Sequence, residues 1–171
     1  GRVLGWVRVR HSLRKYARLC GMRGTARPAS DELARIYGLE VVTVPPHRPC
    51  IRIDHPDVIY ASKDAKRRAL AEEITRVHAT GRPILVGTVS VEESGRLAAD
   101  LRQGGIACRV PNARNDAEEA EIVAEAGALG AVTISTNMAG RGTDIRLGGV
   151  GEVQRDAVVA LGGLYVLGTN R

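Results

Sequence analysis

Short apolar runs alternate with amphipathic stretches along this chain, and that order restricts the fold more than any other feature. The run 83–88, PILVGT, is apolar at nearly every position, which is typical of a strand covered on both faces of a parallel sheet. Apolar runs of this kind predict six strands, at 39–46, 57–62, 83–88, 106–111, 130–136 and 163–169.

Helical periodicity fills the intervals between these runs. Leu70, Ile74 and Val77 mark the buried stripe of the first amphipathic stretch, and Ser90 with Glu93 forms a capping box at the start of the second. The predicted helices are 62–81, 90–105 and an acidic helix at 115–127. Strands and helices that alternate at this spacing predict an α/β fold, with a mostly parallel sheet and helices on both faces.

Composition limits the core and the chemistry. The chain of 171 residues is long enough for a substantial core, which must be aliphatic because Phe is absent. No apolar stretch approaches the ~18 residues that a membrane span requires. Cys20, Cys50 and Cys108 form no CxxC pair, so we expect buried thiols rather than a zinc or redox site. The first residue, Gly1, suggests a piece of a longer protein.

Positive charge is concentrated at the N-terminus. Residues 1–30 hold eight of the 25 Arg and Lys residues and no acid, which leaves 17 basic residues against all 19 acids in 31–171. A basic arm can bind nucleic acid or anionic lipid, or it can be a solvated helix of a larger protein. No aromatic residues alternate with the basic ones, which disfavours single-stranded nucleic acid.

One loop combines glycine, arginine and aspartate at the end of a predicted strand, where ligands bind in α/β sheets. Gly140 and Gly142 allow close backbone approach, and exposed N–H groups there can cradle an anion. Arg141 can neutralise charge on a transferring phosphoryl group, whereas Asp144 suits a ribose hydroxyl or a hydrogen bond to the arginine. The alternative is a tight turn with an exposed Arg–Asp pair.

The sequence of this loop, TISTNMAGRGTDIRLGG at 133–149, resembles the fifth helicase-type motif of SecA, the motor ATPase of bacterial protein export. The segment 19–26, LCGMRGTA, is similar to another SecA segment, with Arg23 where the family has Thr. Further similar blocks, in the family's order, are 44–54, 81–94, 111–127 and 161–171. The similarity covers roughly residues 12–171 and is strongest to the accessory, second SecA of actinobacteria.

This resemblance implies a RecA-like P-loop NTPase fold of the helicase C-terminal motor type. Residues 1–27 would be a basic remnant of the preceding interdomain region, including the GMRGTA loop. Residues 28–171 would be the second nucleotide-binding domain, truncated before the sixth motif.

The resemblance also implies roles for the loop residues. Arg141 would be catalytic, and the nucleotide contacts would come from six residues: Gly140, Gly142, Thr143, Asp144, Thr136 and Asn137. ATP and Mg²⁺ would be the cofactors, with Mg²⁺ held mainly by the first nucleotide-binding domain, and no residue of this chain is predicted to bind metal. The chain has no Gly-Lys pair, and hence no Walker A loop, and no predicted strand ends in Asp-Glu. We therefore expect the chain alone to be inactive.

The implied partners are the SecYEG channel, preproteins and the first nucleotide-binding domain. Anionic lipids are a further candidate partner, and nucleic acid is disfavoured. The implied location is cytoplasmic, peripheral to the inner face of the cell membrane. Two alternatives stay open: the C-terminal RecA-like domain of a nucleic-acid helicase, and an inactive orphan chain. The sequence TNMAGRGTDI and the scarcity of aromatic residues disfavour the helicase.

Overall fold

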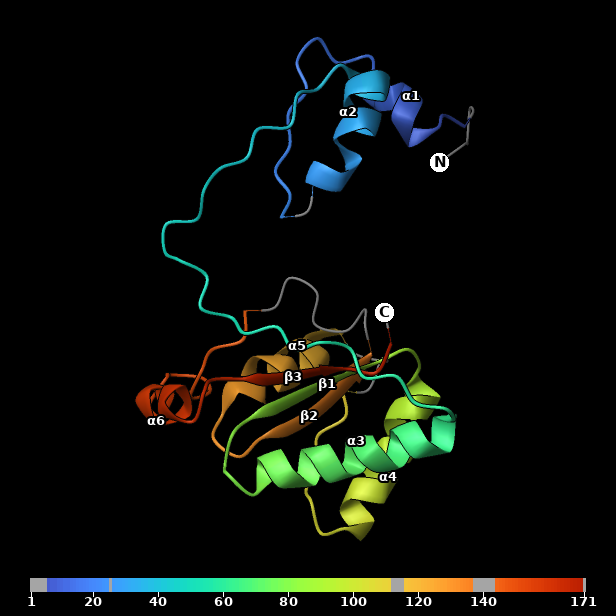
Figure 1. Ribbon diagram of the computed structural model, residues 1–171. Helices are drawn as coiled ribbons and strands as arrows, with labels where there is room; N and C mark the ends of the chain where they lie inside the picture. Colours follow the sequence, from blue (N-terminus) through green and yellow to red (C-terminus); the bar gives the residue numbers. More distant parts are fainter. Residues whose placement is uncertain (1–5, 25, 112–115, 137–143, 171) are drawn as a thin grey trace. The chain divides into compact units, whose positions relative to one another are not determined.

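The computed structural model describes residues 6–24, 26–111, 116–136 and 144–170 (Figure 1). The chain divides into two compact units, residues 1–56 and 57–171. The domain boundary predicted between residues 27 and 28 lies inside the first unit, and it stays a prediction.

The second unit is built on three parallel strands in the order β2-β1-β3. They are β1 (Ile84–Thr88), β2 (Val132–Thr136) and β3 (Tyr165–Gly168). In the central strand, Ile84 lies opposite Val132 on one side and Tyr165 on the other. These strands confirm the predictions for 83–88, 130–136 and 163–169. The predicted strand at 106–111 is reduced to a single parallel bridge between Arg109 and Thr133.

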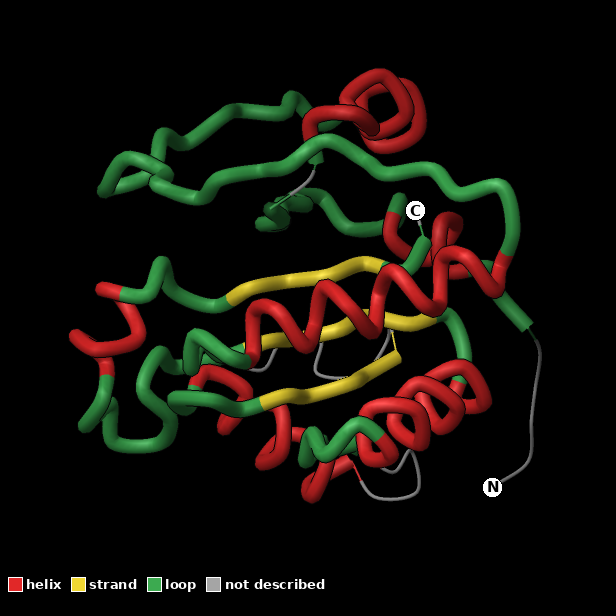
Figure 2. Tube along the Cα trace, turned by 60° about the horizontal axis from the view of Figure 1, so that its bottom comes forward, coloured by secondary structure: helices red, strands yellow, loops and turns green. Residues whose placement is uncertain are grey.

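Helices cover both faces of this sheet. Figures 1 and 2 show α3 (Lys63–His78) and α4 (Val91–Gln103) packed on one side and α5 (Asp116–Ala124) on the other. A 3₁₀ turn, η2 (Glu125–Gly127), follows α5, and α6 (Arg155–Ala160) precedes β3. The three predicted helices are confirmed, whereas α6 was not predicted.

Serine side chains define where α3 and α4 begin. Ser62 Oγ accepts a hydrogen bond from Ala65 N–H at 3.1 Å, and Ser90 Oγ accepts one from Glu93 N–H at 3.2 Å. Each bond satisfies a backbone donor that has no partner within the first helical turn. The caps thus fix both helix starts, as the sequence predicts for Ser90.

The core of the second unit is aliphatic, as the absence of Phe requires. Ile84 and Val86 of β1 and Ile134 of β2 are fully buried against the two helices. The helices contribute Ile74 and Val77 from α3, and Leu97, Ala98 and Leu101 from α4. Leu70, predicted for the same stripe, is only half-buried at its edge.

The first unit contains α1 (Val9–Leu13), the 3₁₀ turn η1 (Arg27–Ala29) and α2 (Ser30–Tyr37). None of its described residues is buried. The predicted strand at 39–46 is wrong, because this stretch is extended without a neighbouring strand among the described residues. The predicted strand at 57–62, in the second unit, is wrong for the same reason. A strand needs a neighbour to pair its backbone N–H and C=O groups.

The cysteines also depart from the prediction of buried thiols. Cys20 and Cys50, in the first unit, are exposed. Cys108, in the second unit, is half-buried, and this burial raises the pKa of its thiol. The prediction is therefore wrong for the two cysteines of the unit that buries nothing.

Candidate functional site

The candidate site lies at the carboxyl edge of the sheet, where all three parallel strands end. Thr88 closes β1 and lies in register with Thr136, which closes β2. Thr136 is half-buried, and Asp144 is exposed, on the far side of the predicted nucleotide loop. The structure therefore fixes the two ends of that loop. The other predicted site residues lie outside the described residues: Asn137, Gly140, Arg141, Gly142 and Thr143.

A buried group of hydroxyls holds the carboxyl end of β1. Thr88 is completely buried, and its Oγ1 lies 2.6 Å from Ser94 Oγ of α4. The same Thr88 hydroxyl lies 3.2 Å from the backbone oxygen of Ser90 and 3.4 Å from that of Ser135 in β2. This one side chain links β1, β2 and the start of α4 at the edge beside the loop.

Sequence reasoning missed the role of Thr88 and Ser94. Alternation along PILVGT offered a signal, because it places Thr88 on the same buried face as Ile84 and Val86. Most buried threonine hydroxyls have a hydrogen-bond partner. Ser94, four residues into α4, turns the same way toward the sheet.

Asp144 is the described residue of the loop with the most accessible charge. Its side chain is 87% exposed, and Asp144 Oδ2 lies 3.8 Å from Arg146 Nε. An ion pair this exposed contributes little to stability. The carboxylate is therefore available to a ligand, and its two oxygens can accept hydrogen bonds from sugar hydroxyls.

The described donors and acceptors match the sugar of a nucleotide better than its other parts. A hydroxyl at Thr136 and an exposed carboxylate at Asp144 suit the sugar. Within the described ranges, no group of three or more His, Cys, Asp or Glu residues could hold a metal ion.

A hollow of the second unit lies away from this edge. A shallow groove of about 450 Å³ runs between α3 and α4, lined by Ala71, Thr75, Leu101 and Ile106. Ala71, Thr75 and Leu101 belong to the later turns of the two helices and Ile106 follows α4, whereas the carboxyl edge lies at the helix starts. The groove therefore has no part in the candidate site.

Comparison with known proteins assigns this architecture. Residues 49–156 match the family model described as the SecA P-loop domain. The parallel sheet with helices on both faces is thus the α/β fold of a SecA P-loop domain. The chain belongs to the SecA family.

Relatives named as SecA proteins align with the whole chain. The chain is 52% identical to protein translocase subunit SecA 2 of Thermobifida fusca and 51% identical to SecA 2 of Corynebacterium diphtheriae. Both alignments cover 100% of this chain and 22% of the relative, so the chain spans about a fifth of the length of these curated relatives. The expectation that residues 1–11 fall outside the similarity is therefore wrong.

Among the described residues, no helix is long and apolar enough to cross a membrane.

Proposed function

We propose that this chain is the second nucleotide-binding domain of a SecA motor. It would close over ATP held mainly by the first nucleotide-binding domain. The single observation that carries this proposal is the segment 137–143, which connects Thr136, at the carboxyl end of β2, to the exposed Asp144. Ligands of parallel α/β sheets bind at this edge.

Each proposed role follows from side-chain chemistry. Arg141 would stabilise the negative charge that develops on the γ-phosphoryl group as water attacks it. Gly140, Gly142 and Thr143 would bring backbone N–H groups close to the phosphates. Asp144 would accept hydrogen bonds from the sugar or hold Arg141. Thr136 and Asn137 would couple the loop to the interface between the two nucleotide-binding domains.

The metal ion would belong mainly to the partner domain. No carboxylate cluster among the described residues could hold Mg²⁺, and the full sequence contains no Gly-Lys pair for a phosphate loop. The chain alone would then position and stabilise without binding the β-phosphate and the metal. This division of roles supports the proposal that the isolated chain does not hydrolyse ATP.

The remaining partners follow from the family. Closure and opening of the motor would drive preproteins through the SecYEG channel, at the cytoplasmic face of the cell membrane. Anionic lipid would be a further contact for the basic segment 1–27, and nucleic acid would not be a partner. Residues 28–171 would form the motor domain proper.

The test uses a chimera, because the chain spans only about a fifth of its relatives. This chain replaces the aligned 171 residues of the Thermobifida fusca SecA 2, and ATP turnover and nucleotide affinity are measured. We expect Arg141→Ala to reduce turnover by about 10³-fold, as for an arginine finger, with little change in affinity. Arg141→Lys should rescue poorly, because lysine lacks the planar guanidinium.

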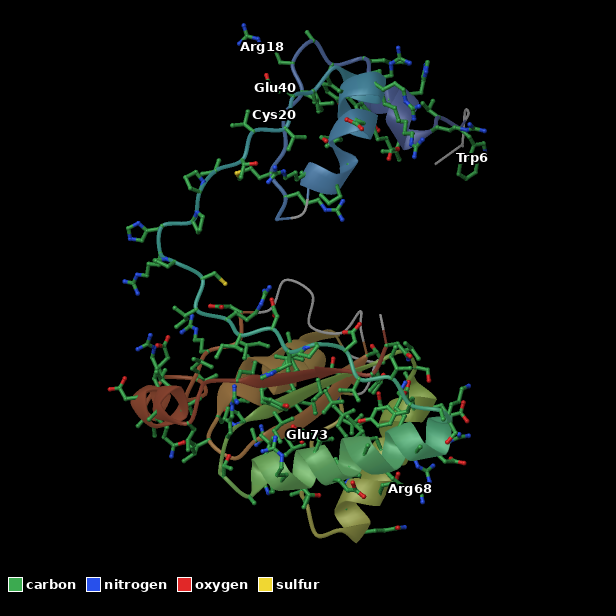
Figure 3. All side chains as sticks on the ribbon, viewed as in Figure 1. Trp6, Arg18, Cys20, Glu40, Arg68 and Glu73 are labelled. Carbon is green, nitrogen blue, oxygen red and sulfur yellow. The ribbon has the colours of Figure 1, made fainter. Side chains whose placement is uncertain are left out.

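Arg68→Ala is the matched control. Arg68 lies exposed on α3 (Figure 3), far along the chain from the loop, and its loss should leave turnover unchanged. Normal turnover in the Arg141→Ala chimera would show that the loop is only a turn. The isolated chain should release no phosphate above background, and motor-like turnover by it would contradict the division of roles.

A further inference from the structure

The chain that returns from the nucleotide loop lies directly against η2. A Cβ added at Gly127 would meet the carbonyl oxygen of Arg146 at 2.2 Å. Gly148 N–H donates a hydrogen bond to the Gly127 carbonyl at 2.8 Å. Gly148 has a φ of +89°, and a Cβ there would lie 2.4 Å from the backbone nitrogen of Arg155. Only glycine fits at both positions, because any side chain would push the two backbones apart.

A carboxylate from η2 holds the same returning segment. Glu125 Oε1 accepts a hydrogen bond from Val150 N–H at 3.1 Å. Its other oxygen, Oε2, lies 2.9 Å from the place that a Cβ of Gly149 would occupy. Gly149 N–H in turn donates to the Arg146 carbonyl at 3.1 Å. The half-buried Glu125 thus holds a tight backbone turn through a hydrogen bond to Val150, which is 25 residues further along the chain.

We call this contact between residues 125–127 and 146–150 the η2 seam. The η2 side of the seam belongs to the body of the sheet, because Ala131, just after η2, accepts a hydrogen bond from Ile84 N–H of β1 at 2.8 Å. The opposite side carries Asp144, which is two residues before the seam and pairs with Arg146. The nucleotide loop therefore leaves the sheet at Thr136 and is tied back to it at the η2 seam.

We infer that Glu125 is a positioning residue for nucleotide binding, acting through the η2 seam on Asp144. This inference rests on the proposed function of Asp144. Without the carboxylate, Val150 N–H loses its acceptor, and the returning chain is held to η2 less tightly, by the Gly148 N–H bond to the Gly127 carbonyl. Asp144 then spends less time where it can meet the sugar of a bound nucleotide, so affinity falls while the chemistry at Arg141 is spared.

The experiment is a double-mutant cycle in the chimera, with ADP as the probe and affinity measured by calorimetry. Glu125→Ala should weaken ADP binding about tenfold, the effect of losing one charge-assisted hydrogen bond. Glu125→Gln should recover most of this loss, because the amide oxygen still accepts from Val150 N–H. In an Asp144→Ala background, Glu125→Ala should cause no further loss, since the two residues act in series.

Each result decides the inference. Equal losses from Glu125→Ala with and without Asp144 would overturn it, because a general loss of structure is additive. Normal ADP binding by Glu125→Ala, with weakened binding by Asp144→Ala, would overturn this inference alone. Normal binding by Asp144→Ala would overturn the proposed role of Asp144 together with the inference. If Glu125→Ala does not fold, as judged by thermal unfolding, Glu125→Met keeps the side-chain length without the acceptor and answers the same question.

Discussion

The two units of this chain treat similar sequences in opposite ways. In residues 57–171, the apolar run PILVGT becomes the central strand β1, and its Ile84 is completely buried. In residues 1–56, the apolar run LEVVTV at 39–44 stays extended and unpaired among the described residues, and its Val44 is 83% exposed. The difference teaches that an apolar run becomes a strand only where neighbours pair its backbone and cover its side chains.

The first prediction tests whether the two units differ as domains. Residues 57–171, expressed alone, should unfold cooperatively in urea, because their core is continuous across α3, α4 and the sheet. Residues 1–56 alone should show no cooperative transition, since none of the described residues there is buried. Circular dichroism through a urea titration measures both. A sigmoidal transition for 1–56 would break the comparison.

The second prediction compares one isoleucine from each unit. Ile134 is completely buried in β2, whereas Ile53 is 78% exposed. Ile134→Ala should lower the free energy of unfolding by about 2–5 kcal/mol, through lost burial and the cavity left behind. Ile53→Ala should change it by less than ~0.5 kcal/mol. Chemical denaturation of both variants in the 171-residue chain gives the values, and a large loss at Ile53 would mean that the first unit has a core of its own.

The local sequence pattern was sufficient to predict a helix or strand wherever tertiary packing favoured the same element. The helices α3 and α4 follow from an apolar stripe behind a capping serine, and the strands β1, β2 and β3 from apolar runs with turns at both ends. The run at 39–46 carries the same local signal, but strand pairing also requires a neighbouring strand, which the local sequence does not reveal. The helix α6 escaped notice because its six residues, RDAVVA, are too few for a periodic pattern.

The candidate site likewise contains residues that the sequence reveals and residues that only tertiary contacts reveal. Sequence reasoning predicted a site at the loop between Thr136 and Asp144 because glycine, arginine and aspartate are informative by themselves, and this site stays a prediction. It missed Thr88, Glu125 and Gly127, whose importance depends on what lies opposite them: a serine hydroxyl, a backbone N–H and a carbonyl oxygen. A half-buried glutamate near the end of a helix has no sequence signature that separates it from a solvated one.

The smallest predicted effect sharpens the comparison at single polar contacts. Tyr165 of β3 donates a hydrogen bond to Glu73 Oε1 of α3 at 2.6 Å, across 92 residues of sequence. In the first unit, Arg52 and Asp54 pair at 2.8 Å, but both are exposed and only two residues apart. The first contact joins two elements of a fold, whereas the second joins neighbours that are close in the unfolded chain too.

Tyr165→Phe should therefore cost about 1 kcal/mol of unfolding free energy, and Asp54→Asn should change nothing measurable. The hydrogen bond to Glu73, with a smaller effect of burial, raises the pKa of Tyr165 above its usual value of 10.0. A raised pKa in the folded state means that this stabilisation is complete below about pH 10 and is lost as the pH rises through the folded-state pKa. The difference in unfolding free energy between the wild-type chain and Tyr165→Phe, from urea titrations, should accordingly be larger at about pH 8 than at about pH 11. A difference that is the same at both values would mean that the phenol hydroxyl does not bind Glu73 in solution.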